Sequence, residues 1–265
     1  MPSITALRSR VESSLAGRIP APFAYRDRRV VDTASSGIPE IDLLAGGLPR
    51  GGLTEICGPP CSGRTSLLLS ALAARTAQAE VCALVDGRDG FDPHAAQAAG
   101  VQLEQLLWVR CREMEQALRA TDLLLRGGGF GLIAVDLADM APETVRGVPL
   151  NAWFRFRRAI EDTPAILLLL EQESNAKTCA SLVLRLDAEP ARWLATCEDP
   201  GSLRHSWTCL LDGFGVRAEK IHARVQPVKE IVFAGPPWRT AGAADSSGIF
   251  QTRTGWSYLN QPKTK

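Results

Sequence analysis

Short runs of apolar residues alternate with amphipathic segments along the central part of the chain. Apolar strands are predicted at residues 53–57, 80–86, 107–109, 132–136 and 165–170. Helical spacing of apolar residues predicts helices at residues 38–44, 67–78, 93–99, 114–125 and 153–160. Near-continuous apolar strands that alternate with helices are typical of a parallel sheet covered on both faces. We therefore predict an α/β fold with a mainly parallel central sheet flanked by helices.

The beginning of the chain follows a separate pattern. Ile4, Leu7, Val11 and Leu15 form one apolar stripe, which predicts an amphipathic N-terminal helix at residues 4–18. A proline-containing linker follows this helix and gives it reach. The stripe must be buried either on the chain's own core or on another protein, and we expect it to mediate a partner or self contact.

Beyond residue 180 the alternation of strands with helices is lost. Apolar runs at residues 181–186, 192–196 and 207–211 predict an antiparallel extension of the sheet. From Gly235 the chain is rich in Pro, Gly, Ser and Ala and has little periodicity, which predicts an irregular, flexible C-terminal tail. The predicted domains are residues 1–32 (helix and linker), 33–234 (core) and 235–265 (tail).

The segment between the first apolar strand and the following helix has the pattern of a phosphate-binding loop. Its sequence, GPPCSGRTS, fits G-x-x-x-x-G-K-[ST] at every fixed position except one, where Arg64 replaces the lysine. In such a loop backbone N–H groups and the following helix start surround phosphates, and the threonine hydroxyl binds Mg²⁺. We therefore predict an ATP and Mg²⁺ site that includes Gly58, Gly63, Arg64, Thr65 and Ser66. A glycine-rich turn without a ligand is the structural alternative.

Residues for nucleotide hydrolysis are less complete. Arg64 keeps a positive charge, but its guanidinium is larger and more rigid than an ammonium group, so nucleotide affinity stays open. Asp136 ends an apolar strand, where an acid can organise Mg²⁺ through water or simply cap a turn. Hydrolysis also needs a group that orients the attacking water. Gly87, Arg88 and Asp89 follow Asp86, with no glutamate among them, which predicts weak or absent ATPase activity.

Composition excludes several classes of protein. Of 265 residues, 45% are hydrophobic and 22% are charged, as in a soluble globular protein rather than a disordered one. The net charge of +1 provides no overall field for nucleic acid. No run is long enough to span a membrane and no secretory signal is seen, so we expect a cytoplasmic protein. Seven cysteines without a metal-binding spacing are expected to be reduced thiols.

A basic and aromatic segment at residues 153–158 permits two interpretations. Arginines beside aromatic rings suit single-stranded nucleic acid. On a helix, however, Trp153, Phe156 and Ile160 share one face and would be core, with the arginines pointing outward. We favour the second interpretation.

With these motifs located, residues 34–187 resemble the core of the RecA recombinases. The matching positions are the run 35–51, Glu55-Ile56, Gly58-Pro59, Ser62-Gly63, Asp92-Pro93, Gly100-Val101, Leu106-Leu107, 116–118, Asp136 and Gln172. The resemblance implies a RecA-like P-loop fold. It also implies that Asp92 contacts adenine and that Gln172 senses the nucleotide.

The departures from the RecA pattern concern catalysis and DNA. The resemblance places Arg88 where the family has its catalytic glutamate, and Ala95 where it has an adenine-stacking tyrosine. The segments 137–150 and 173–179 stand where the family has two DNA-binding loops, and both are short. These losses together argue against a recombinase.

A RecA-like core reduced in this way looks like the ImuA family, accessory proteins of the bacterial mutasome. That resemblance implies an adaptor in SOS-induced translesion DNA synthesis, with weak or absent ATPase activity. The implied partners are an ImuB-like relative of the Y-family polymerases, RecA and an error-prone replicative-type polymerase, with direct DNA contact left open. The alternative function is a DNA-stimulated ATPase that uses Arg64 as the P-loop cation.

Overall fold

A computed structural model describes residues 32–195, 209–223 and 247–253 of the chain. The predicted N-terminal helix at residues 4–18 lies outside these residues. So does most of the predicted tail. For residues 192–195, 209–213 and 247–253, only the backbone is described.

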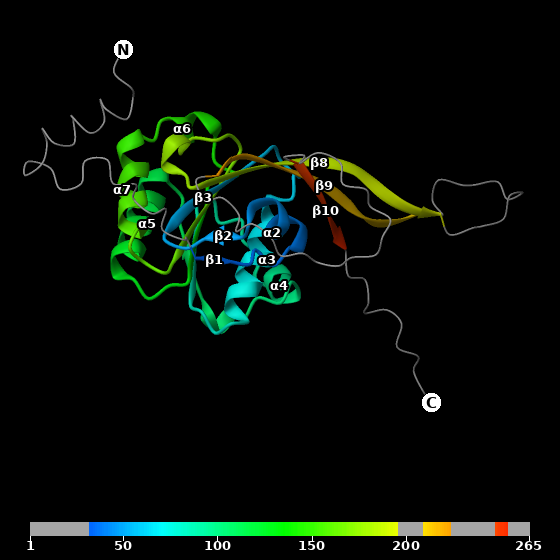
Figure 1. Cartoon of the computed structure of the whole chain (residues 1–265), viewed down its shortest axis with the longest axis horizontal. Helices are drawn as coiled ribbons and strands as arrows, with labels where there is room; N and C mark the ends of the chain where they lie inside the picture. Colours follow the sequence, from blue (N-terminus) through cyan, green and yellow to red (C-terminus); the bar gives the residue numbers. More distant parts are fainter. Residues whose placement is uncertain (1–31, 196–208, 224–246, 254–265) are drawn as a thin grey trace, which may run out of the picture. The chain divides into compact units, whose positions relative to one another are not determined.

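One eight-stranded sheet forms the centre of the described core, in the order β10-β9-β8-β3-β7-β6-β4-β5 (Figure 1). Its parallel strands are β3 (Gly52–Cys57), β4 (Cys82–Asp86), β5 (Leu106–Arg110), β6 (Leu132–Asp136), β7 (Ile166–Glu171) and the first part of β8. The strands β8 (Leu182–Ala195), β9 (Cys209–Ala223) and β10 (Ser247–Arg253) pair antiparallel with one another. The predicted parallel sheet with an antiparallel extension is therefore confirmed.

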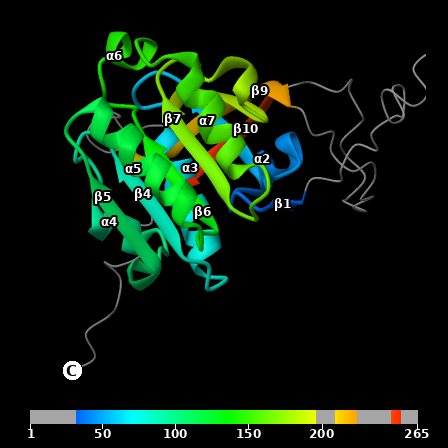
Figure 2. The same cartoon turned by 90° about the vertical axis from the view of Figure 1, so that its left-hand side faces the viewer.

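Helices cover both faces of the parallel strands (Figures 1 and 2). One face packs against α2 (Pro39–Ala45), α3 (Arg64–Thr76) and α4 (Pro93–Ala98). The other face packs against α5 (Met114–Gly127), α6 (Pro142–Arg146) and α7 (Leu150–Ile160). Every side chain of β3, β4 and β7 is buried, because alternate residues enter the two layers. This double burial explains why these strands are continuous apolar runs in the sequence.

The antiparallel extension differs from its predicted pieces. Residues 182–186 and 192–195 of the first two predicted runs belong to the single strand β8, and residues 209–211 of the third belong to β9. The pairing register shifts between Ala188 and Ala191, on either side of Pro190. Since proline has no N–H to donate to a neighbouring strand, it interrupts the ladder and the sequence pattern without ending the strand.

Several further elements, including α6, were not predicted. β1 (Thr33–Ala34) and β2 (Leu48–Pro49) pair as a short antiparallel ribbon ahead of β3. Within the region expected to be irregular, β10 pairs with β9 from Gly213 to Glu219. The sequence of β10 has little alternation of apolar and polar residues, so it does not predict a strand. The strand forms through backbone pairing with β9.

No helix in the described part of the chain is long and apolar enough to cross a membrane. Cys57, Cys61, Cys82 and Cys111 are free thiols. Burial raises the pKa of Cys57 to about 11 and that of Cys82 to about 12, so both remain neutral thiols.

Candidate functional site

The P-loop lies between the carboxyl end of β3 and the start of α3. Gly58 is buried there, and a Cβ atom at this position would lie 2.1 Å from the carbonyl oxygen of Leu186 on β8. Gly63 has φ +90°, and its added Cβ would lie 2.7 Å from Val216 on β9. Both positions therefore require glycine, because the loop is pressed against the two neighbouring strands.

The start of α3 presents unpaired backbone donors. The first intrahelical contact of the loop is the N–H of Leu67, which donates to the Gly63 carbonyl at 3.0 Å. No side chain caps the helix at Gly63, so the N–H groups of the first turn, which include Thr65 and Ser66, lack helical partners. The Ser62 hydroxyl is buried and has no partner among the described groups. A phosphate group would satisfy these donors, and the loop therefore fits a nucleotide.

The replaced lysine position has an unexpected contact. Arg64 is only 6% exposed, and its Nη1 donates to the main-chain carbonyl of Glu171 at 2.8 Å. Burial lowers the pKa of Arg64, while the charges of Asp136 and Asp139 raise it. Arginine nevertheless keeps its proton in proteins. The guanidinium is therefore a charged link between the P-loop helix and the end of β7.

The structure brings three predicted residues around one small cavity of about 110 Å³. Thr65, Asp92 and Asp136 all line it. Asp139 also lines this cavity, although the sequence interpretation did not include it. Its position in the loop that follows β6, three residues after Asp136, could have indicated that it lies at the same site. The other predicted residues, Gly58, Gly63, Arg64, Ser66 and Gln172, lie outside the lining.

Asp136 and Thr65 are suitably placed for a metal bound together with a nucleotide. Thr65 is exposed, and one oxygen of Asp136 accepts the Ala138 N–H at 3.0 Å. Burial, with help from the charges of Asp139 and Asp86, raises the pKa of Asp136 to about 6. No cluster of three acidic, histidine or cysteine side chains in the described residues forms a metal cage by itself. Mg²⁺ commonly uses one or two carboxylates together with phosphate oxygens and water, so this donor set fits.

Asp86 has a structural role in the loop after β4. Its carboxylate accepts the backbone N–H groups of Arg88, Gly90 and Phe91 at 3.2, 3.1 and 2.9 Å. It also accepts Nε1 of Trp108 at 3.2 Å. These four contacts use Asp86 to shape the loop.

The cavity has no glutamate where a hydrolytic group is expected. Arg88 is exposed and lines the cavity at that position. Asp89, its neighbour, pairs instead with Arg110 through both carboxylate oxygens and does not line the cavity. Asp89 is the acid nearest in sequence to the position expected for a glutamate, and its carboxylate is held by Arg110.

Asp92 and Gln172 each have a structural contact. Asp92 caps α4 by accepting the His94 N–H at 2.9 Å. The side-chain amide N–H of Gln172 donates to the Ala138 carbonyl at 2.9 Å. The main-chain carbonyl of Gln172 accepts the Gly58 N–H at 3.2 Å. Gln172 therefore joins the end of β7 to the P-loop and to the loop after Asp136. Contact of either residue with a nucleotide stays a prediction.

A pair of buried acids was missed by sequence reasoning. Glu55 on β3 and Glu171 on β7 are both 0% exposed and point to the same face of the sheet. Glu55 accepts Ser174 Oγ and the N–H of Asn175, both at 2.6 Å, and the Ala176 N–H at 3.0 Å. Burial and the charge of Glu55 raise the pKa of Glu171 to about 8. We infer that Glu171 is protonated at neutral pH.

The segment at residues 153–158 adopts the core arrangement that we favoured. Trp153 and Phe156 on α7 are 2% and 1% exposed, with ring centroids 6.0 Å apart. Arg155 pairs with Asp122 of α5 at 3.0 Å, and Figure 2 shows these two helices side by side. The aromatic rings are therefore unavailable for stacking on bases, except for the half-exposed Phe154.

Comparison with known proteins finds similarity over the first half of the chain. Residues 21–147 match the family described as the RecA N-terminal domain. Protein RecA of Psychrobacter cryohalolentis is 43% identical over 113 residues, which are 43% of this chain and 32% of the relative. Protein RecA of Ectopseudomonas oleovorans is 42% identical over 118 residues, which are 44% of this chain and 34% of the relative. The chain thus spans about a third of the length of these curated relatives.

Proposed function

We propose that this chain is a RecA-like accessory protein of mutagenic DNA-damage tolerance; the match of residues 21–147 to the RecA N-terminal domain supports the RecA-like part of this proposal. It acts through protein contacts in translesion DNA synthesis, and its ATPase activity is weak or absent. The proposed partners are an ImuB-like polymerase relative, RecA and an error-prone replicative-type polymerase.

The observation that carries this proposal is the composition of the cavity beside Thr65. The loop after β4 brings Arg88 to it and no glutamate, and Asp86 is occupied by four hydrogen bonds. A water molecule next to a bound phosphate would find no glutamate from this loop, and the carboxylates of Asp86 and Asp92 already accept backbone N–H groups. The backbone of the P-loop, together with Thr65 and Asp136, would still hold ATP and Mg²⁺ as a structural ligand.

Nucleotide binding and turnover are tested separately. A fluorescent ATP analogue should bind the protein in the presence of Mg²⁺. Thr65→Ala should weaken binding at least tenfold, whereas Thr65→Ser, which keeps the hydroxyl, should retain it. Phosphate release should stay near background with and without single-stranded DNA. If neither the wild type nor Thr65→Ser binds the analogue, the loop has only a structural role.

The second candidate function is a DNA-stimulated ATPase. Arg64 keeps a cation at the lysine position, and the identity to RecA is as compatible with an active enzyme as with an adaptor. Turnover that rises with single-stranded DNA and disappears in Thr65→Ala would establish this function and overturn the adaptor proposal.

The adaptor role is tested by affinity purification of the full chain from cells after DNA damage. The proposed polymerase relative should be recovered, and deletion of residues 1–30 should abolish its recovery. A folded truncated protein that still recovers the partner would contradict the role assigned to the N-terminal stripe.

A further inference from the structure

Helices α5 and α7 lie side by side on one face of the sheet, as Figure 2 shows. Each helix belongs to a connection between two parallel strands, so the two helices run in the same direction. The P-loop helix α3 covers the opposite face of the sheet. The outer surface of α5 and α7 is therefore separate from the nucleotide site.

Exposed side chains form a row on the outer side of each helix. They are Arg119, Leu123 and Arg126 on α5, and Leu150, Phe154, Arg155 and Arg158 on α7. Their spacing of three or four residues places them on one side of each helix. Leu123 is 66% exposed and Phe154 is 43% exposed, so apolar side chains stand among the arginines. We call these residues the α5–α7 surface.

Positive charge exceeds negative charge along this surface. Asp122, between the two helices, is shared by Arg126 at 2.9 Å and Arg155 at 3.0 Å. Its side chain is only 17% exposed, whereas these two arginines are 66% and 53% exposed. Arg119 and Arg158 make no ion pair with another side chain in the part of the chain that the structure describes. One aspartate is thus set against four exposed arginines.

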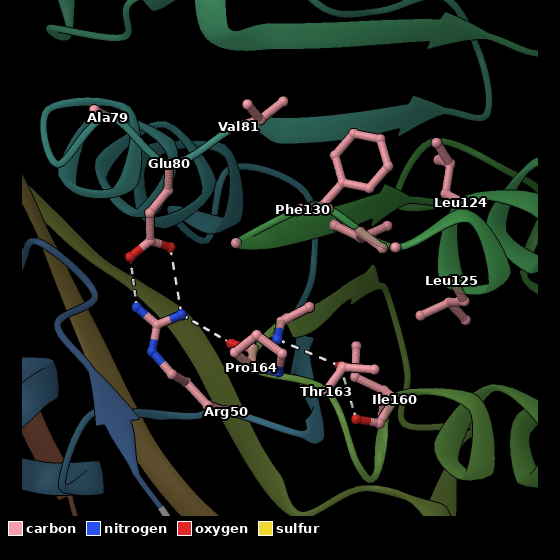
Figure 3. Close-up of a pocket in the computed structure, with 15 residues that line it drawn as sticks. Arg50, Ala79, Glu80, Val81, Leu124, Leu125, Phe130, Ile160, Thr163 and Pro164 are labelled. Atoms are coloured by element: carbon pink, nitrogen blue, oxygen red, sulfur yellow. Dashed lines mark hydrogen bonds and ion pairs between the residues drawn. The ribbon is translucent and has the colours of Figure 1, made fainter.

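A cavity of about 470 Å³ at the amino ends of the strands has no such excess of charge (Figure 3). Arg50 on its wall pairs with Glu80 at 2.5 Å and donates to the Pro164 carbonyl at 2.8 Å. Leu125, on the inner side of α5, also lines this cavity. The arginine of α5 without an ion pair, Arg119, instead faces solvent on the outer side of the helix.

We propose that the α5–α7 surface binds an acidic amphipathic segment of another protein. The carboxylates of this segment face the four arginines, and its apolar side chains cover Leu123 and Phe154. Complementary charge directs association and selects the partner. Arginine and aromatic side chains are also enriched at protein interfaces. The inference requires neither a bound nucleotide nor a role in DNA-damage tolerance.

The N-terminal segment of a second copy of this chain is a poor match for this surface. Residues 1–31 contain six arginines and two acids. Although the segment has an apolar stripe, its charge has the same sign as that of the α5–α7 surface. Like charges at an interface disfavour binding, so the charge argues for a different protein as the partner.

A nucleic acid is also a poor match. Leu123 and Leu150 have no ring on which a base could stack. Acids flank the two rows, because Glu115 lies in the first turn of α5 and Glu161 follows α7. Together with Asp122 they would repel a chain of phosphates, whereas a folded acidic segment needs to meet only the arginines.

The charge requirement is tested on the unmodified full chain with a fluorescent peptide made of three Leu-Glu-Glu-Leu-Leu-Glu-Glu repeats. Fluorescence anisotropy should show saturable binding of this acidic peptide. The same peptide with lysine in place of every glutamate should bind at least tenfold more weakly. Equal binding of the two peptides, or no saturable binding of the acidic one, would refute the proposal.

Charge reversal locates the binding surface. The double substitution Arg155→Glu and Arg158→Glu should weaken binding of the acidic peptide at least tenfold. The matched control is Arg112→Glu with Arg217→Glu, because both arginines are exposed outside this surface and the net charge changes equally. The control should bind within twofold of the wild type. Equal loss in the two double variants would overturn the proposal.

The apolar contact and the nucleic-acid alternative have their own measurements. Leu123→Ser should weaken peptide binding at least threefold, whereas Leu43→Ser, at a side chain that is 79% exposed on α2, should leave it within twofold. Equal effects of these two substitutions would remove Leu123 from the interface. If the Arg155 and Arg158 reversal weakens binding of a fluorescent oligothymidylate and leaves peptide binding unchanged, the surface binds nucleic acid and the proposal is wrong.

Discussion

At the scale of single residues, Arg64 changes the interpretation of the P-loop. Its guanidinium is buried and donates to the Glu171 carbonyl, so its charge is directed toward the end of β7. A bound phosphate has to compete with that carbonyl for the guanidinium. A lysine at this position has a compact ammonium group and would not create the same competition. Binding and catalysis therefore depend on how the end of β7 is held, as well as on the loop itself.

Substitution of Arg88 tests whether the cavity lacks only a carboxylate. Arg88→Glu places an acid beside Thr65 and Asp136, where the attacking water would be activated. General base catalysis contributes roughly 10²–10⁴-fold in enzymes, so we expect phosphate release to increase at least tenfold. The control is Arg88→Gln, which removes the cation without adding a base. An equal increase in both variants would show that only the positive charge was inhibitory.

The acid pair of Glu55 and Glu171 predicts a dependence of stability on pH. The pKa of Glu171 is raised from 4.5 to about 8, so the folded state holds its proton more tightly than the unfolded state. The stabilising effect is complete below pH 4.5 and is lost as pH rises through about 8. Glu171→Gln cannot ionise, and it should exceed the wild type in free energy of unfolding at pH 8.5 by on the order of 2–4 kcal/mol.

Urea unfolding at several pH values measures this difference. At pH 4.5 and below, the gap between Glu171→Gln and the wild type should be smallest. Glu173→Gln is the matched control, because Glu173 is 57% exposed and pairs with Arg146 at the surface. A parallel pH profile for the wild type and Glu171→Gln would show that the folded state does not raise the pKa of Glu171.

Some residues of the site were predictable and others were not. Thr65 and Asp136 meet because Asp136 ends β6 and Thr65 lies just beyond the carboxyl end of β3, which the order of motifs already implied. The acid pair was not predicted, although Glu55 and Glu171 interrupt apolar strands. The sequence does not show which strands are neighbours, so two acids on separate strands cannot be recognised as partners. Likewise, no local pattern predicts that Arg64 donates to a main-chain carbonyl 107 positions away.

At the scale of elements, α7 shows how tertiary packing resolves an ambiguous pattern. The spacing of Trp153, Phe156 and Ile160 places all three on the sheet, where they are at most 2% exposed. The arginines between them remain at the surface, and Arg157 pairs with Glu161 at 3.4 Å. A basic and aromatic composition is thus compatible with an ordinary amphipathic helix.

Two aromatic residues on α7 provide a matched comparison. Phe156→Ala should lower the free energy of unfolding by about 3–5 kcal/mol, because it leaves a cavity in the core. Phe154→Ala, at a side chain that is 43% exposed, should lower it by less than about 1 kcal/mol. Denaturant unfolding measures both. A loss of single-stranded DNA binding by the stable Phe154 variant would restore the nucleic-acid interpretation of this segment.

The antiparallel strands β8, β9 and β10 were harder to predict than the parallel strands. The buried parallel strands were predicted from their continuous apolar runs, because a strand buried on both faces has apolar residues at nearly every position. In β8, Pro190 and the polar residues around it divided one strand into two predicted pieces. Strand β10 is held mainly by pairing with β9, and such backbone pairing is not visible in side-chain patterns.

At the scale of the whole described core, the sheet is protected unequally from its centre to its ends. β3 and β7 are buried on both faces and have a strand on each side, whereas β5 pairs, among the described strands, only with β4 and is half exposed. Amide hydrogen exchange should therefore be slower in β3 and β7 than in β5, by at least about 100-fold. Exchange measured by mass spectrometry tests this order. Similar rates would mean that the sheet opens as one unit.

The terminal position of β5 has a consequence for solubility. An open strand edge offers unpaired backbone groups to another chain and favours aggregation. Here the strand is short and ends at Arg110, which stacks over Trp108 at 5.0 Å and is tied to Asp89. The charge at the end of the edge disfavours stacking of further strands, although Leu107 is partly exposed. Asp89, in the loop after β4, thereby helps to protect this edge of the sheet from pairing with another chain.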